Sequence, residues 1–141
     1  MKDAVRIVAI VASIALAAPA LAQPIRLGEL NSYKVFPAFL EPYRKGMELA
    51  LQEVNDAGGV LGRKLEIVSR DDNGTPGDAV RVAEELISRE KVALLMGTFA
   101  SNVGLAVADL AKQRRILFIA ASVFGFSQTP NEGSAPANEV R

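Results

Sequence analysis

The groups best suited to chemistry in this sequence lie in a short segment between two apolar stretches, Thr98-Phe99-Ala100-Ser101-Asn102. The apolar residues before it, ending at Gly97, predict a buried strand, and the periodic apolar positions from Val103 onward predict a helix. A strand-to-helix corner exposes backbone N–H groups and the positive end of a helix dipole, with Ser101 as the expected N-cap. These donors suit a bound carboxylate or another small anion. Capping of its own helix, without any ligand, is the alternative role for Ser101.

An enzyme built on this corner would need groups that activate Ser101 as a nucleophile. Asp71 and Asp72 are candidates for an acid and a base, but they are consecutive, and the sequence contains no histidine. The glycines form no G-x-G-x-x-G pattern after a strand, and Asp71-Asp72-Asn73 lacks the later glutamate of a calcium-binding loop. We therefore expect a binding protein with no catalytic residue, metal or cofactor.

The first 22 residues have the features of an export signal. Lys2 and Arg6 precede an apolar run at residues 7–18, and Ala20-Leu21-Ala22 provides a small-x-small cleavage site. The alternative, a transmembrane anchor, would need a longer run to cross roughly 30 Å of hydrocarbon. We predict that residues 1–22 are a signal peptide and that the mature chain begins at Gln23.

The composition of the mature chain argues against several classes of partner. Removal of Lys2, Arg6 and Asp3 from 16 basic and 16 acidic residues leaves a net charge near −1, so a nucleic-acid partner is not expected. The absence of cysteine rules out disulfides and a lipid-anchored cysteine. The length of 141 residues leaves room for one domain. We expect a diffusible exported protein.

Apolar segments alternate with amphipathic segments along the rest of the chain. The apolar segments predict four buried strands, at residues 25–30, 65–69, 92–96 and 116–120. Three helices are predicted between them: one from Glu41-Pro42 to Gly58-Gly59, one that begins with a capping box from Thr75 to Asp78, and one from about Asn102. This order predicts an α/β fold class with a Rossmann-like parallel sheet and helices on both faces.

Polar residues follow each predicted strand at its carboxyl end, where open parallel sheets bind ligands. The clusters are Asn31-Ser32, Asp71-Asp72, residues 98–101 and Ala121-Ser122. The stretch 31–40 shows neither helical nor strand periodicity, so we expect a loop there. Its aromatic residues, including Tyr33 and Phe36, either line a ligand pocket or cover the edge of the sheet.

Three blocks of the sequence resemble the branched-chain amino-acid (Leu/Ile/Val) binding proteins. The runs GMELA at 46–50 and EVNDAGGVLGRKL at 53–65 resemble the first helix and following turn of that family. DDNGTP at 71–76 is similar to the acidic turn after the family's second strand, and GTFAS at 97–101 to its ligand-binding corner. The spacing among the blocks also agrees, and the resemblance covers residues 25–121.

The resemblance implies a type I periplasmic binding protein, with residues 23–121 as the amino-terminal lobe. Such a protein is the substrate-binding component of an ABC importer, which captures an amino acid or related small carboxylate in the periplasm and delivers it to an inner-membrane permease. In the family, the serine at the third-strand corner binds the ligand's α-carboxylate, and this position falls on Ser101. The ligand-binding residues implied here are Ser101, Asn102, Phe99, Ser122, Tyr33 and Phe36. A sensor lobe for an amide or amino acid is the alternative function.

The sequence departs from the family pattern after the fourth predicted strand. There the family has a loop whose backbone and threonine hydroxyl hold the ligand's carboxylate, whereas this sequence has Ser122-Val123-Phe124. The family's chains also continue into a second lobe. Residues 122–141 lack apolar periodicity, so we expect an unstructured tail from a truncated or frameshifted reading frame. A non-functional truncated product is a further alternative.

Overall fold

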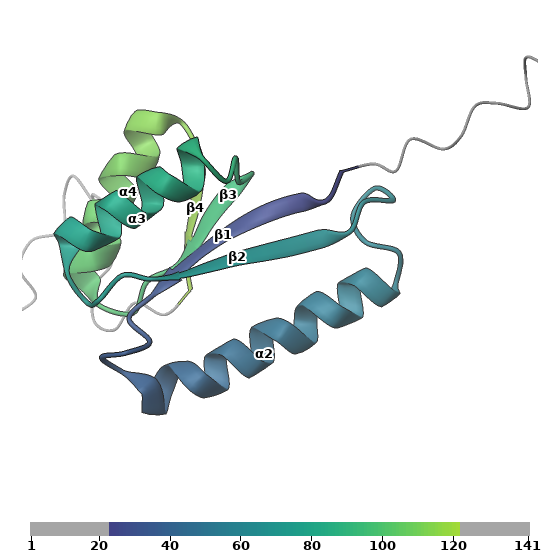
Figure 1. Ribbon diagram of the computed structural model, residues 1–141, viewed down its shortest axis with the longest axis horizontal. Helices are drawn as coiled ribbons and strands as arrows, with labels where there is room; N and C mark the ends of the chain where they lie inside the picture. Colours follow the sequence, from purple (N-terminus) through teal and green to yellow (C-terminus); the bar gives the residue numbers. More distant parts are fainter. Residues whose placement is uncertain (1–22, 122–141) are drawn as a thin grey trace, which may run out of the picture.

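The computed structural model describes residues 23–121, so the predicted signal peptide and the predicted tail lie outside the described residues. The elements are β1 (Ile25–Asn31), α2 (Pro37–Asp56), β2 (Leu65–Asp71), α3 (Pro76–Ser88), β3 (Leu94–Gly97), α4 (Ser101–Arg114) and β4 (Leu117–Ala120). The strands form one parallel sheet in the order β2-β1-β3-β4. Helices α3 and α4 cover one face of the sheet, and α2 lies against the opposite face (Figure 1). The predicted fold class is confirmed.

The strand order reverses between β1 and β3. The chain leaves β1 for β2 on one side and crosses through α3 to β3 on the other side. The carboxyl ends of β1 and β3 therefore flank a topological switch point, the place where open α/β sheets bind ligands. Leu30 pairs with Gly97 across these strands, so the two following loops begin side by side.

The hydrophobic core lies between the sheet and the α3–α4 layer. A Cβ on Gly28 would lie 3.0 Å from the Val92 side chain and 3.1 Å from that of Leu95, so glycine lets these side chains close over the centre of the sheet. The core residues come from the strands and from both helices of this layer: Leu30, Val68, Leu95, Ala79, Val82, Ala83, Leu86, Val103, Val107 and Leu110. This packing fixes α4 and therefore the corner at which α4 begins.

Helix α2 packs much less deeply on the other face. Leu40 is its only buried residue. The apolar face of this helix, which includes Met47 and Leu51, lies over an open apolar cavity of about 180 Å³ between α2 and the strands. Val54 on the same face remains 37% exposed. No helix in the part of the chain described here is long and apolar enough to cross a membrane.

The prediction for the start of the first helix is wrong. The helix begins at Pro37 rather than at Glu41, because Pro37 supplies the first-turn proline whose missing N–H costs no hydrogen bond. Pro42 lies inside the helix, where it has no N–H to donate to the Ala38 carbonyl. The segment predicted as a loop therefore includes the first helical turn. Its periodicity is hidden because Leu40 alone is buried in that turn.

The fourth strand is present, but it is not buried as predicted. Leu117 is 62% exposed and Ile119 is 48% exposed. The reason is its position, since β4 is an edge strand and α2 lies over the β1–β2 side of the sheet. An apolar run alone does not distinguish an edge strand from a central one.

Two predicted helix signals are confirmed. The Asp78 N–H donates a 3.3 Å hydrogen bond to Thr75 Oγ1 at the start of α3, which is the N-cap bond of a capping box. The Thr75 N–H donates to the Asp72 carbonyl and not to the Asp78 carboxylate. At the end of α2, Gly58 and Gly59 follow Asp56 with positive φ values of 104° and 77°. These φ values are open to glycine without the steric cost that other residues pay.

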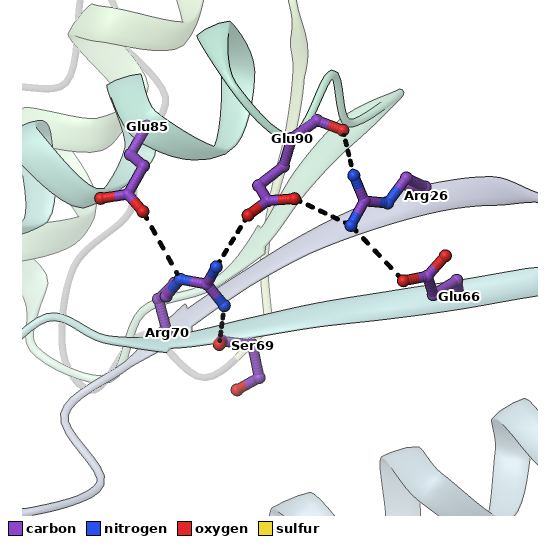
Figure 2. Close-up of polar contacts among 6 residues, drawn as sticks. All are labelled: Arg26, Glu66, Ser69, Arg70, Glu85 and Glu90. Atoms are coloured by element: carbon purple, nitrogen blue, oxygen red, sulfur yellow. Dashed lines mark hydrogen bonds and ion pairs between the residues drawn. The ribbon is translucent and has the colours of Figure 1, made fainter.

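Ion pairs link the end of the α3 region to the strands (Figure 2). Arg26 of β1 lies 2.8 Å from Glu90 and 3.4 Å from Glu66 of β2. Arg70 of β2 lies 2.9 Å from Glu90 and 3.9 Å from Glu85 of α3. Glu90 therefore bridges two arginines on neighbouring strands and holds the segment after α3 against β1 and β2.

Candidate ligand-binding site

Aromatic side chains from two loops meet at the carboxyl edge of the sheet. Phe36, at the end of the β1–α2 loop, lies 4.7 Å from Phe99 of the β3–α4 corner, measured between ring centroids. Phe39, in the first turn of α2, lies 5.6 Å from Phe99 and is 61% exposed. The structure thus brings together Phe36 and Phe99 among the predicted ligand residues. We call Phe36, Phe39 and Phe99 the aromatic cluster.

The backbone of the β3–α4 corner is tightly held. The Thr98 N–H donates to the Leu30 carbonyl at 2.8 Å, and the Ala121 N–H donates to the Gly97 carbonyl at 3.0 Å. Gly97 has a φ of 115°, and a Cβ there would overlap the Leu30 carbonyl oxygen. Thr98 also has a positive φ, 62°, which is unfavourable for a β-branched residue. The corner therefore has a fixed and strained backbone.

Ser101 is the first residue of α4, and the expectation that it is the N-cap is wrong. Ala100 holds the N-cap position, and its carbonyl accepts the Gly104 N–H at 2.9 Å. The helix begins earlier than predicted because Thr98 turns the chain before Ala100. Ser101 and the exposed Asn102 therefore lie in the first turn, whose backbone N–H groups have no acceptor within an α-helix. The positive end of the helix dipole lies at this turn.

Two other predicted ligand residues are not part of the aromatic cluster. Tyr33 is buried, its hydroxyl donates to Glu29 Oε1 at 2.9 Å, and the Arg44 guanidinium lies 4.0 Å from its ring centroid. It lines a cavity of about 460 Å³ between α2 and β2, together with Arg44 and Ser69. Ser122 lies outside the described residues.

Glu29 of β1 is fully buried beneath the site, although nothing in the local sequence singled it out. Its Oε1 accepts hydrogen bonds from Tyr33 Oη at 2.9 Å and from Asn31 Nδ2 at 3.1 Å, and its Oε2 accepts from Ser69 Oγ at 2.5 Å. Burial raises the pKa of Glu29 more than these hydrogen bonds lower it. The signal that could have found it is a glutamate at an inward-facing position of a strand.

Asp71 and Asp72 use their carboxylates to shape loops. Asp72 Oδ1 accepts from Ser32 Oγ at 2.6 Å and from the Gly74 N–H at 2.9 Å, and burial raises the pKa of Asp72. Asp71 accepts from the Asn73 N–H at 2.7 Å and the Lys34 N–H at 3.0 Å. Such contacts are typical of carboxylates that close turns.

The arrangement at the carboxyl edge suits binding. It places an apolar aromatic surface beside the amino terminus of α4, where a carboxylate is stabilised. Within residues 23–121, no group of His, Cys, Asp and Glu side chains is placed to hold a metal ion. A small molecule with a carboxylate and an apolar part matches both features.

The known proteins to which this chain is similar are also binding proteins. The sequence profile of a family described as periplasmic binding protein matches residues 35–138. The Leu/Ile/Val-binding protein homolog 7 of Brucella suis biovar 1 is 36% identical over 104 residues, which are 73% of this chain and 26% of that protein. This chain therefore spans about a quarter of the length of the curated relatives it matches.

Solved structures share the fold. The branched-chain amino acid transporter substrate-binding protein LivJ of Streptococcus pneumoniae, in complex with isoleucine, has a TM-score of 0.66 and 27% identity, and the match covers 71% of this chain and 29% of that one. A solute-binding protein of an ABC transporter from R. palustris, in complex with benzoate, has a TM-score of 0.63 and 29% identity, covering 70% of this chain and 27% of that one.

Proposed function

The chain belongs to the periplasmic binding protein family, and we propose that it is the amino-terminal part of the substrate-binding component of an ABC importer. The relative from Brucella suis is named a Leu/Ile/Val-binding protein homolog, and LivJ is a transporter substrate-binding protein. The parallel sheet with its switch point between β1 and β3 supports a ligand site at the carboxyl edge. The proposed activity is binding without turnover.

The proposed ligand is an amino acid or a related small carboxylate. Its carboxylate would accept hydrogen bonds from the first turn of α4 and from the Ser101 hydroxyl, and the helix dipole would stabilise its charge. Its apolar part would lie against Phe36 and Phe99, whose ring centroids are 4.7 Å apart. The contact between these rings beside the α4 amino terminus is the observation that carries the proposal.

The aromatic cluster favours a ligand with a large apolar or aromatic group. LivJ is solved with isoleucine and the R. palustris protein with benzoate, so an aliphatic amino acid and an aromatic carboxylate are the two candidate types. They share the carboxylate and differ in the ammonium group. The ring of Phe39 is 61% exposed, so the apolar part of either ligand type could pack against it.

The place of action proposed for the protein is the periplasm, with an inner-membrane ABC permease as its partner. The basic residues, apolar run and small-x-small site in residues 1–22 support export. The permease is inferred from the family alone.

The affinity of this chain alone should be low. The matched 104 residues are 26% of the Brucella suis relative, so that protein is nearly three times as long as this chain of 141 residues. In the proposed site, residues 23–121 would contact a ligand from one side only. A half-exposed ligand keeps its contact with water, so we expect a dissociation constant on the order of 1 mM or weaker.

The experiment is an NMR titration of the mature chain with isoleucine, phenylalanine and benzoate. Amide shifts should concentrate in residues 99–103, and Ser101→Ala should weaken them. Ser88→Ala is the matched control, because Ser88 is an exposed serine on α3 whose Oγ donates to the Glu84 carbonyl. Absence of shifts at high ligand concentration, or shifts confined to the Tyr33–Arg44 cavity, would contradict the proposed site.

A further inference from the structure

One buried carboxylate, that of Glu29, bonds to the start of the β1–α2 loop and lies beside the end of β3. Glu29 Oε1 accepts hydrogen bonds from Asn31 and Tyr33, which lead into the β1–α2 loop. The same oxygen lies 3.3 Å from the position that a Cβ of Gly97 would occupy, directly before the β3–α4 corner. Its other oxygen is bonded to Ser69 of β2. Glu29 thus lies where three neighbouring strands end.

We propose that Glu29 is a positioning residue for the ligand site, because its carboxylate sets the separation between the loop that carries Phe36 and the corner that carries Phe99. The inference deepens the proposed function and rests on it, since it takes these two segments to be the ligand-binding loops. Glu29 itself is fully buried and does not face the ligand.

Tyr33 transmits the position of Glu29 to Phe36. The Tyr33 hydroxyl is fixed by Glu29, and its ring is held from the α2 side by Arg44, 4.0 Å from the ring centroid. The Phe36 N–H donates to the Ser32 carbonyl at 2.9 Å, which closes a tight turn from Ser32 to Phe36 that contains Tyr33. A displaced Tyr33 would therefore displace Phe36, and with it the contact to Phe99.

Ionisation of Glu29 suits this role. All three hydrogen bonds use Glu29 as the acceptor, and they use both of its oxygens. An amide at the same position has one acceptor oxygen, so it could keep the Ser69 contact only by reversing the direction of that hydrogen bond. The charged and titratable groups that face it are Tyr33 from the loop and Arg44 and Tyr43 from α2, and the neutral donors are Asn31 and Ser69. The Arg44 charge favours the carboxylate, whereas burial disfavours it.

The test compares Glu29→Gln with Glu66→Gln in the full 141-residue chain. Both substitutions replace a carboxylate on adjacent strands with an amide, but Glu66 faces the solvent near Arg26. With phenylalanine labelled, the nuclear Overhauser contact between the Phe36 and Phe99 rings should weaken in Glu29→Gln, which loses the charge and must reverse the Ser69 hydrogen bond, and should be unchanged in Glu66→Gln. Tyrosinate absorbance should show a lower pKa for Tyr33 in Glu29→Gln, because burial and then the Glu29 carboxylate raise that pKa in the wild type and the variant removes the second cause.

The inference is overturned if Glu29→Gln lowers the melting temperature while the ring contact and the Tyr33 titration stay as in the wild type. If Glu29→Gln does not fold, Ser69→Ala decides, because it removes one hydrogen bond to Glu29 and leaves the carboxylate in place. An unchanged ring contact in Ser69→Ala then overturns the inference, and a weakened one supports it. These readouts need no ligand, so their failure is distinct from a failure of the proposed function, which the ligand titration tests.

Discussion

Ser32 Oγ donates a 2.6 Å hydrogen bond to Asp72 Oδ1, and both side chains are fully buried. Ser32 begins the loop after β1, and Asp72 begins the turn after β2. The same carboxylate oxygen accepts the Gly74 N–H. One buried acid therefore joins the ends of two neighbouring strands at the edge where the candidate site lies, on the opposite side of β1 from Gly97.

Asp72→Ala should lower the free energy of unfolding by about 2 kcal/mol, because it leaves the Ser32 hydroxyl and the Gly74 N–H without their acceptor. Urea unfolding followed by circular dichroism measures the loss. Asp109→Ala is the control, since Asp109 is exposed on α4, and its effect should stay within about 0.5 kcal/mol. An equal loss of unfolding free energy in the two variants would show that the Asp72 hydrogen bonds do not stabilise these loops.

A pair of glycine substitutions should change stability in opposite directions. Gly97→Ala should destabilise the chain by about 3 kcal/mol, because φ is 115° and the new Cβ would overlap the Leu30 carbonyl oxygen. Gly46→Ala should stabilise it by about 1 kcal/mol, because Gly46 lies inside α2 with no atom near its Cβ position. Thermal unfolding of both variants checks the sign. If Gly97→Ala leaves the stability unchanged, the backbone of the corner can shift enough to accommodate the new Cβ.

The stability of the chain should fall as the pH rises above the usual range of carboxyl groups. Burial raises the pKa of Glu29 above its ordinary 4.5 and that of Asp72 above its ordinary 3.8, so the folded chain holds these protons more tightly than the unfolded chain. The stability that Glu29 and Asp72 contribute is fully present below their ordinary pKa values, and it is lost as the pH rises through their raised pKa values.

The contribution of Asp78 to stability depends on pH in the opposite direction, and it changes at lower pH. Hydrogen bonds from Asn73 and then Arg81 lower its pKa below the ordinary 3.8, so its contribution is present above pH 3.8 and is lost as the pH falls through the lowered value. Together the groups place maximum stability on the acidic side of neutrality. Urea unfolding over a series of pH values measures this, and Glu29→Gln should flatten the decline towards neutral pH. A steady rise in stability up to neutral pH would refute the assignment.

Glu90→Gln should weaken the ion-pair network of Figure 2 and cost about 1 kcal/mol, because Glu90 contacts both Arg26 and Arg70. The arginines are partly exposed, so high salt should shrink the difference between variant and wild type. Glu53→Gln, at an exposed position of α2, is the matched control and should be neutral. A loss that is independent of salt would indicate that packing, not charge, holds this segment.

The parts of the fold that could be predicted are those with local causes. The capping box at Thr75 and Asp78 uses residues three apart, and the corner after Gly97 is marked by a change from an apolar run to a helical period. Phe36 and Phe99 could be proposed as site residues because the carboxyl ends of parallel strands share one edge of the sheet.

The parts that could not be predicted depend on neighbours in space. The role proposed for Glu29 depends on its hydrogen bonds with Ser69 and Tyr33, and the bond with Ser69 forms only when β1 pairs with β2. Tyr33 has the residue type expected of a ligand contact, yet Glu29 and Arg44 hold it under α2. The exposure of Leu117 follows from the strand order, which no single segment specifies.

The shallow packing of α2 indicates which wall of the candidate site opens first. A helix that buries Leu40 alone opens at a lower free energy than the sheet, so its amide hydrogens exchange with water without global unfolding. Because α2 begins directly after Phe36, each local opening loosens one wall of the aromatic cluster, while α4, packed in the core, keeps the Ser101 corner folded. If a ligand binds between them as proposed, we expect it to dissociate when α2 opens, so its residence time should follow the rate at which α2 opens locally.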